Sequence, residues 1–344
     1  MIKQQDDVEY RNSQVDNYKT FLIFLVVLGH FLIQLRLLLA SDIITVVYYW
    51  IYLFHMPAFI FISGYLSKGY AKRGGDFRKL LGFLVLYVIF KLLIYTINQM
   101  MGNTVSFSLF YEKGAPWYLL AMFWYYLLIP VISKLNSRLL LIVASVLTTM
   151  LIPFYDGANS FLALTKTINF LPFFLLEYYY DCTKERLKVL HELMSRKISK
   201  FLSWAFLVLI ALMVYLQLDT VKSLEGLMYG DKSFGTLGFS SAEGICIKLL
   251  YLIIVTLMII CSLYSVPFNT NILSYIGSRT LAVYIGHILL RPIIFKADPF
   301  SYMNNDIIIL VFVCIISFAE VILLSWKPFS IICNSAFSFK KNHQ

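Results

Sequence analysis

The stretch from Thr20 to Leu39 reads TFLIFLVVLGHFLIQLRLLL. A membrane-spanning helix needs roughly 20 predominantly apolar residues, and this stretch has that length and character. The first 19 residues are polar and charged, and the apolar run that follows them is too long for the h-region of a signal peptide. We therefore expect this stretch to remain in the protein as its first spanning helix.

The composition of the whole chain continues this pattern. Of its 344 residues, 60% are hydrophobic and only 14% are charged, whereas a soluble domain typically carries about 25% charged residues. The composition excludes a soluble protein and predicts an all-α fold, a polytopic membrane bundle of about ten transmembrane helices in one domain that covers 1–344. The predicted spans are 20–39, 43–66, 80–100, 116–133, 138–155, 161–181, 200–217, 245–265, 273–295 and 306–327.

The basic residues indicate how the chain is oriented. With an even number of spans, most of the 29 lysine and arginine residues fall on the same side as the N-terminus, and cytoplasmic loops carry such an excess. Both termini are therefore predicted to be cytoplasmic, as a segment 1–19 and a tail 328–344. The net charge of +10 reflects topology beside an anionic leaflet rather than binding of nucleic acid.

Charged residues and glycines elsewhere give further expectations. Lys91, Glu177 and Glu320 fall in or near predicted spans, and each is expected to have a charged partner. The segment 218–244 is rich in glycine, so it is either a flexible loop or a lid over an external acceptor. The chain contains no internal repeat, which counts against the transporters that are built from repeats.

Three of the five histidines fall in the middle of predicted spans. His30 lies in the first span, His55 in the second and His287 in the ninth. Ionisable side chains within a bilayer are costly, usually face the interior of the bundle and mark function. Imidazole is also suited to proton transfer near neutral pH. Any one of these histidines could be structural, but the three together favour a catalytic centre.

A metal centre and a serine-type triad are alternatives for these histidines. Zinc ligands on a helix are typically one turn apart with carboxylates or thiolates nearby, whereas each of these histidines is alone on its span. The five cysteines form no CxxC pair, and no GxSxG motif is present. We therefore expect no metal and no triad, and we expect the cysteines to act as small buried hydrophobic side chains.

Two charged residues lie at the end of the segment before the first span. Asp16 is suited to cap the start of the helix, and Lys19 follows one turn later. Lys19 precedes His30 by about 16 Å along a helix that rises 1.5 Å per residue. This arrangement suits an elongated anionic ligand that enters from the cytoplasm, with its phosphates at the surface and its reactive end at His30. Lys19 could equally serve only to set the topology.

The second span also contains a histidine, and basic residues follow it in the next loop. Pro57 follows His55 by two residues, and a proline kinks a helix and frees a backbone carbonyl. The basic loop that comes next includes Arg78 and Lys79, on the same side as Lys19. This loop could bind phosphates or simply follow the positive-inside rule.

Five groups of short motifs occur in a specific order along the chain. They are Asp16-Asn17-x-Lys19 running into Val27-Leu28-Gly29-His30, Phe54-His55-Met56-Pro57 through Ser63-Gly64-Tyr65, Pro116-Trp117-Tyr118-Leu119-Leu120-Ala121, Phe170-Leu171-Pro172-Phe173-Phe174-Leu175, and Gly277-Ser278-Arg279-Thr280 with Tyr284-x-x-His287. In order and spacing these motifs resemble acyltransferase family 3 and, within it, the fucose 4-O-acetylase-like branch of sugar acetylases. The resemblance covers residues 11–290.

The resemblance implies an enzyme of the bacterial plasma membrane. Members of the family transfer acyl groups, commonly acetyl from acetyl-CoA, to hydroxyls of cell-surface polysaccharides or lipid-linked sugars. His30 matches the family's best catalytic candidate, as a general base or an acyl carrier. Many members carry arginine where this chain has Lys19 and Lys166, and lysine keeps the charge but loses the bidentate fork.

The resemblance and the residue chemistry together predict a site with three sets of residues. The catalytic set is His30, His55 and His287; the set that binds acyl-CoA is Lys19, Arg78, Lys79 and Arg279; and the set that binds the acceptor or an oxyanion is Asp16, Trp117, Tyr118, Lys166 and Tyr284. The expected partners are acyl-CoA, a surface glycan or lipid-linked sugar, and membrane lipids.

Two other classes of function stay open at this point. A non-enzymatic exporter or flippase of a glycan or lipid would also suit the intramembrane histidines and the basic inner face. A membrane scaffold for a glycan-synthesis complex is the other class, and it leaves the three histidines unexplained.

Overall fold

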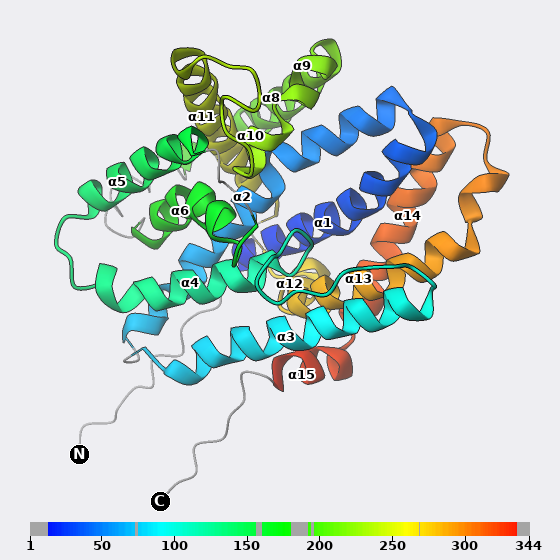
Figure 1. The fold of residues 1–344 in the computed structure, drawn as a ribbon, viewed down its shortest axis with the longest axis horizontal. Coiled ribbons are helices and arrows are strands. Elements are labelled where there is room, and N and C mark those ends of the chain that lie inside the picture. Colours follow the sequence, from blue (N-terminus) through cyan, green and yellow to red (C-terminus); the bar gives the residue numbers. More distant parts are fainter. Residues whose placement is uncertain are drawn as a thin grey trace, which may run out of the picture.

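The chain folds into a bundle of α-helices, as a computed structural model shows (Figure 1). The structure describes residues 13–72, 75–155, 160–179, 192–193, 196–267 and 269–335. Within these ranges there is no β-strand, and a single isolated bridge joins Tyr111 to Phe161. The prediction of an all-α fold is confirmed.

Seven of the described helices are long and apolar enough to cross a membrane. They are α1 (Ser13–Leu39), α2 (Asp42–Lys72), α3 (Phe77–Met100), α8 (Lys197–Leu216), α11 (Ser241–Ser265), α13 (Thr280–Ala297) and α14 (Asp306–Leu324). Many of their large apolar side chains point outwards, among them Phe201 and Val208 on α8. Such a surface would promote aggregation in water, whereas a bilayer accommodates it. The chain is therefore a multi-pass membrane protein.

Three predicted spans correspond to shorter helices. They are α4 (Trp117–Ile132), α5 (Arg138–Leu151) with the 3-10 turn η1 (Ile152–Phe154), and α6 (Leu164–Tyr179). Both α4 and α6 contain a proline, Pro130 and Pro172 respectively. The count of about ten spans and the cytoplasmic location of both termini stay predictions.

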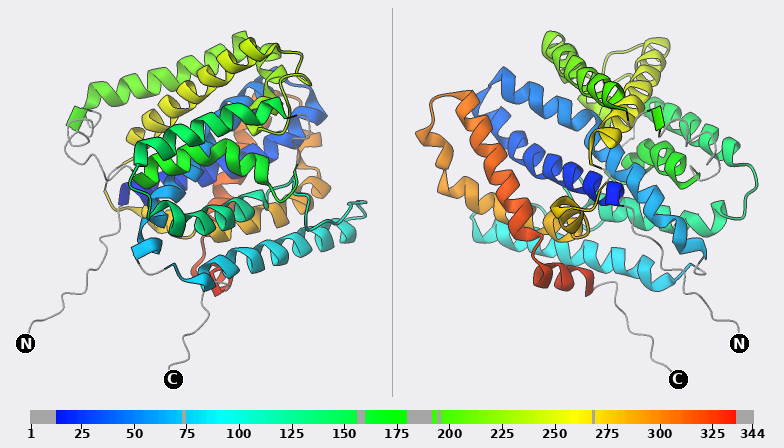
Figure 2. Two further views of the ribbon diagram at one scale, coloured as in Figure 1. Left: turned by 60° about the vertical axis from the view of Figure 1, so that its left-hand side comes forward. Right: turned by 180° about the vertical axis from the view of Figure 1, so that it is seen from behind.

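The bundle is built around α1 and α2. In their most apolar windows, 56% of the residues of α1 and 72% of those of α2 are buried, against 17–39% in the other long helices. α1 contacts α2, α13 and α14, while α2 contacts α6, α8 and α4. Figures 1 and 2 show α8 and α11 on one side of this pair and α13 and α14 on another. His30 and His55 therefore lie on the two central helices.

The prediction of one continuous ninth span over 273–295 was wrong. The structure breaks it into α12 (Ile272–Gly277) and α13. Gly277 lies directly against the backbone of α1, so that a Cβ there would be 1.8 Å from the carbonyl oxygen of Asp16. Ser274 Oγ donates a hydrogen bond of 2.7 Å to Asn17 Oδ1. The chain turns at this point because α12 is fixed to the first turns of α1.

The prediction that Asp16 caps the first helix was also wrong. α1 already includes Ser13, so Asp16 lies inside the helix, where its carboxylate is 3.1 Å from the ammonium of Lys19. Asn17 Nδ2 donates to the carbonyls of Pro267 and Asn269, at 2.8 and 2.9 Å. These tertiary hydrogen bonds hold the start of the helix in place of a local cap.

The charges within the bundle are paired in two of the three predicted cases. Lys91 lies 2.7 Å from Glu112, and Lys68 lies 3.7 Å from Glu177. Glu320 is different, because neither of its buried carboxyl oxygens has a hydrogen-bond partner among the described residues. The prediction of a charged partner was therefore wrong for Glu320. The polar group one turn away on α14 is the hydroxyl of Ser317, which carries no charge and does not bond the carboxylate.

The segment 218–244 is largely helical rather than an open loop. It contains α9 (Leu218–Ser223), α10 (Glu225–Tyr229) and the first residues of α11. Glu225 anchors α10 to α1 and α2, with its carboxylate 3.0 Å from Arg36. The hydroxyls of Tyr48 and Tyr49 donate to the same carboxylate, at 2.9 and 3.0 Å. These residues are therefore not an open flexible loop, and the role of a lid over an external acceptor stays a prediction.

The predicted tail 328–344 begins with structure. α15 (Lys327–Ser335) packs against α13, and Phe329 lies beside Gly286. The rest of the tail, 336–344, and most of the N-terminal segment 1–19 lie outside the described residues.

We predict that Gly277→Ala destabilises the protein, because its methyl group meets a backbone carbonyl that cannot move aside. Overpacking typically costs 1–3 kcal/mol, and the rigid neighbour puts this case at about 3 kcal/mol or more. Thermal unfolding of purified protein, followed by size-exclusion chromatography in detergent, measures the loss. Ser278→Ala is the control, and equal stability of the two variants would contradict the proposed docking.

Candidate active site

His30 and His287 lie far apart in the sequence but meet between α1 and α13. Their ring centroids are 5.1 Å apart. Arg291 joins them, with Nη1 at 3.4 Å from His30 Nδ1 and 3.3 Å from the His30 carbonyl oxygen. His287 and Arg291 are one helical turn apart, so both project from α13 towards α1. Two imidazoles and one guanidinium therefore form the core of the candidate site.

The hydrogen bonds of the other two histidines fix where their protons lie. His287 Nδ1 is 2.8 Å from the carbonyl oxygen of Val283, and His55 Nδ1 is 2.8 Å from that of Ile51. A carbonyl can only accept, so Nδ1 carries the proton in both rings and Nε2 keeps its lone pair. His287 Nε2 is buried and has no hydrogen-bond partner among the described residues. It is therefore free to take a proton from a substrate.

His55 joins this group through Tyr52. The ring of Tyr52 lies 4.6 Å from that of His55 and packs on α1 at Gly29, where a Cβ would be 2.9 Å from Tyr52 Cε2. The glycine thus lets α2 approach α1 immediately before His30. His30 also interacts electrostatically with His55 and His287. The structure therefore brings all three predicted histidines together.

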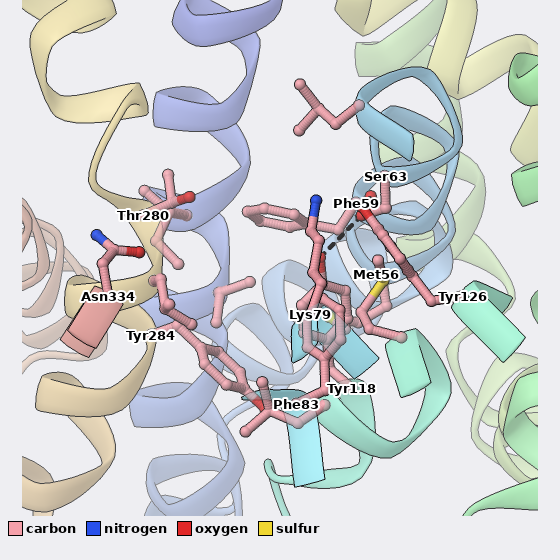
Figure 3. A pocket seen from close by; sticks show the side chains of 16 residues that line it. Met56, Phe59, Ser63, Lys79, Phe83, Tyr118, Tyr126, Thr280, Tyr284 and Asn334 are labelled. Atoms are coloured by element: carbon pink, nitrogen blue, oxygen red, sulfur yellow. Dashed lines mark hydrogen bonds between the residues drawn. The ribbon is translucent and has the colours of Figure 1, made fainter. Parts of the chain in front are cut away.

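A cavity of about 380 Å³ lies next to the histidines (Figure 3). Six helices contribute to its mostly apolar wall. The lining residues are Ile23, Val26, Met56, Phe59, Ser63, Leu66, Lys79, Phe83, Tyr118, Leu119, Met122, Tyr126, Thr280, Leu281, Tyr284 and Asn334. Lys79, Thr280 and Asn334 come from the end of the bundle where α13 begins.

The other end of the cavity adjoins the histidines. Met56 follows His55 in the chain, and the ring of Tyr284 lies 6.2 Å from that of His287. Tyr118 shares a hydrogen bond of 2.8 Å with Ser63 Oγ (Figure 3). Tyr284 donates its hydroxyl proton to a backbone carbonyl in the loop before α4. Tyr118 and Tyr284, both predicted to bind substrate, therefore line the cavity.

The structure brings one of the four predicted acyl-CoA residues into the cavity wall. Lys79 lines it, with Nζ 4.6 Å from the ring centroid of Tyr126. Arg78, its neighbour on α3, is exposed. Lys79 is therefore the one of the four cations that lines the cavity, at the end that we call its mouth.

The remaining two members of that set make contacts within the protein. The guanidinium of Arg279 stacks 3.5 Å from the ring centroid of Tyr275 and donates to the Tyr275 carbonyl. Arg279 directly precedes Thr280 of the cavity wall. Lys19 forms its ion pair with Asp16, which is itself buried. The structure places Asp16 and Lys19 where α12 docks on α1, outside the cavity wall.

The other predicted substrate residues lie on the far side of the histidines. Lys166 Nζ is 5.9 Å from the ring centroid of Trp117 and 5.7 Å from that of Tyr229. The Tyr229 ring lies 5.9 Å from that of Tyr52, which in turn contacts His55. A row of aromatic rings therefore connects Lys166 to the histidines.

Sequence reasoning missed four residues of this region. Arg291 could have been predicted as a site residue, because it follows His287 by one turn and falls inside the predicted span 273–295. Tyr52 likewise precedes His55 by about one turn. Glu225 and Tyr229 lie in the segment between spans, and nothing in their sequence context predicts that they return to α1 and α2.

No group of three or more metal-ligating side chains occurs in the part of the chain that the structure describes. The four described cysteines, Cys246, Cys261, Cys314 and Cys333, are free thiols, and Cys333 is buried. Cys182 lies outside the described residues. The prediction that the cysteines are small buried hydrophobic side chains is confirmed for Cys333. It is wrong for Cys246, which is exposed.

A family model described as an acyltransferase domain matches residues 12–326. The chain belongs to acyltransferase family 3. No curated protein and no solved structure matches the chain. The predicted family is therefore confirmed, while the fucose 4-O-acetylase-like branch stays a prediction. As a membrane acyltransferase, the protein needs an acyl donor and an acceptor.

We predict that Glu225→Ala releases α10 from α1 and α2. The substitution removes the carboxylate shared by Arg36, Tyr48 and Tyr49, and it leaves the arginine without its ion pair. Amide hydrogen exchange in residues 218–230 is expected to become at least tenfold faster, since exchange reports local opening. Asp219→Ala is the matched control, because the Asp219 carboxylate is 97% exposed. Equal exchange in the two variants would contradict the anchoring role.

Proposed function

We propose that this acyltransferase moves an acetyl group from cytoplasmic acetyl-CoA to a hydroxyl of a cell-surface polysaccharide or lipid-linked sugar. The observation that carries the proposal is the meeting of His30, His287 and Arg291 beside the inner end of an apolar cavity. A thioester and a proton acceptor can then be brought together away from water, which acyl transfer to a sugar requires.

The cavity suits the donor because of its shape and lining. Apolar walls fit the slender pantetheine arm of acetyl-CoA, and the ammonium of Lys79 at the mouth fits its phosphates. In this arrangement the thioester reaches Met56 and Tyr284, next to His55 and His287. The exposed Arg78 adds positive charge beside Lys79, on the side that the predicted orientation of the chain makes cytoplasmic.

The proposed chemistry begins with a base. A sugar hydroxyl is a weak nucleophile until its proton is removed, and imidazole does this near neutral pH. His30 is the proposed general base or acyl carrier, and His287 is the proposed second base because its Nε2 lone pair is free. Arg291 holds His30 in position and offers its unpaired Nε–H to negative charge that develops on the carbonyl oxygen.

Two routes are compatible with these groups. In the direct route, the hydroxyl oxygen attacks the thioester carbonyl while its proton passes to imidazole; the C–S bond breaks, and the proton then neutralises the leaving thiolate. In the stepwise route, an imidazole nitrogen displaces the thiolate first; the sugar oxygen then displaces that imidazole while the hydroxyl proton passes to the second imidazole and on to the thiolate. Both routes yield free CoA and a sugar ester.

We predict that His30→Ala and His287→Ala each reduce acetyl transfer at least a hundredfold, since general bases contribute factors of this size. The measurement is glycan-bound acetate in cells, together with CoA thiol release by purified protein in lipid nanodiscs. His343→Ala is the matched histidine control. Undiminished glycan acetate in His30→Ala, with the protein present in the membrane, would reject the proposed function. A wild-type protein that moves glycan across vesicles without cleaving acetyl-CoA would be an exporter.

We predict that Lys79→Glu raises the KM for acetyl-CoA at least tenfold, because the substitution places a negative charge where the phosphates are proposed to bind. The effect should weaken in high salt, since Lys79 lies at the mouth of the cavity. Lys222→Glu, at an exposed position on α9, is the control. Equal KM values for the two variants would place the donor phosphates elsewhere.

A further inference from the structure

A cluster of aromatic and charged side chains lies at the end of the bundle away from the cavity mouth. Trp117 begins α4, Lys166 lies in the first turn of α6, and Tyr229 ends α10. Further along α4, Tyr126 contacts Lys79 at the mouth, so the start of α4 marks the opposite end. Three separate segments of the chain thus meet beyond the histidines.

The ammonium of Lys166 is held without a hydrogen bond. The residue is only 8% exposed and Trp117 only 9%, yet neither side chain donates a hydrogen bond to any described residue. The Nζ atom of Lys166 lies 5.9 Å from the ring centroid of Trp117 and 5.7 Å from that of Tyr229. Both distances are close to the upper limit of about 6 Å for a cation–π contact. Buried donors are normally satisfied, so these donors are available to a ligand.

The charges around Lys166 indicate the kind of ligand. Asp231 and Glu112 both attract the ammonium and Lys113 repels it, while Glu112 is already paired with Lys91. Burial raises the pKa of Asp231, and the nearby Lys166 opposes that rise. An ammonium balanced by a carboxylate favours a neutral ligand with hydroxyls that can both accept and donate. The aromatic faces suit the apolar C–H face of a sugar ring.

We propose that Trp117, Lys166 and Tyr229 form the acceptor subsite and bind a neutral sugar ring, an assignment that rests on the acyltransferase function proposed above. The ring of Tyr229 connects through Tyr52 to His55, at centroid distances of 5.9 and 4.6 Å. Acceptor and donor then approach the histidines from opposite ends of the bundle. α10, anchored by Glu225, carries one wall of the subsite and closes over the sugar as a lid.

The test measures the two substrates separately. Purified protein in nanodiscs receives acetyl-CoA together with methyl α-D-glucopyranoside, methyl β-D-galactopyranoside or methyl α-D-glucuronide, and thiol release and ester formation are followed. The variants are Trp117→Leu, Lys166→Met and Tyr229→Leu. The matched controls are Trp204→Leu, Lys222→Met and Tyr215→Leu, at exposed positions on α8 and α9. An unchanged KM for acetyl-CoA in each variant checks that the protein has kept its fold.

The expected result is a split between the two KM values. Each variant should raise the KM for the neutral glycosides at least tenfold and change the KM for acetyl-CoA less than twofold, while the controls change neither. An unchanged glycoside KM, or equal rises for both substrates, would overturn the subsite while leaving the acyltransferase function in place. A lower KM of the wild type for the glucuronide than for the neutral glycosides would contradict the proposal that the subsite binds a neutral sugar ring. Absence of any thioester cleavage by the wild type would instead reject the proposed function.

Discussion

The contact between Gly277 and the backbone of Asp16 fixes α13 against α1, and the candidate active site depends on it. Without a side chain on Gly277, α12 lies directly on the first turns of α1, and α13 starts from that point. His30 is about 21 Å further along α1 at 1.5 Å per residue, and there it meets His287. Both helices therefore run in the same direction, with the docking contact at one end and the imidazoles further in.

The same principle recurs between the other central helices. Lipid is as apolar as leucine, so membrane helices associate through close packing of small residues and interhelical hydrogen bonds rather than through hydrophobic burial. Gly29 admits the ring of Tyr52, and Gly64 lies so close to α6 that a Cβ would be 2.2 Å from the Phe174 carbonyl oxygen. These glycines lie beside His30 and the cavity, so close packing and the positions of the polar groups are set together.

Sequence reasoning predicted the helical fold and the three histidines because both leave local signals: long apolar runs, and ionisable groups inside them. It did not predict what depends on tertiary packing. The break before α13 follows from the contact of Gly277 with α1, and a glycine inside an apolar run does not by itself reveal such a contact. Arg291 hydrogen-bonds the carbonyl oxygen of His30, and this contact joins two helices that are far apart in the sequence. Tyr229 reaches Lys166 because Glu225, Asn169 and Lys248 hold α10 in place, and these contacts join residues distant in the chain.

The central claim is that His30 and His287 act as one centre, and a double-mutant cycle tests it most directly. Residues that work as a unit are strongly non-additive, because losing one already removes the function of both. The residual rate of acetyl-CoA cleavage would be measured for His30→Gln, His287→Gln and the double variant in nanodiscs. The double variant is expected to be at most about threefold slower than the slower single variant. Losses that multiply would show independent roles and contradict it.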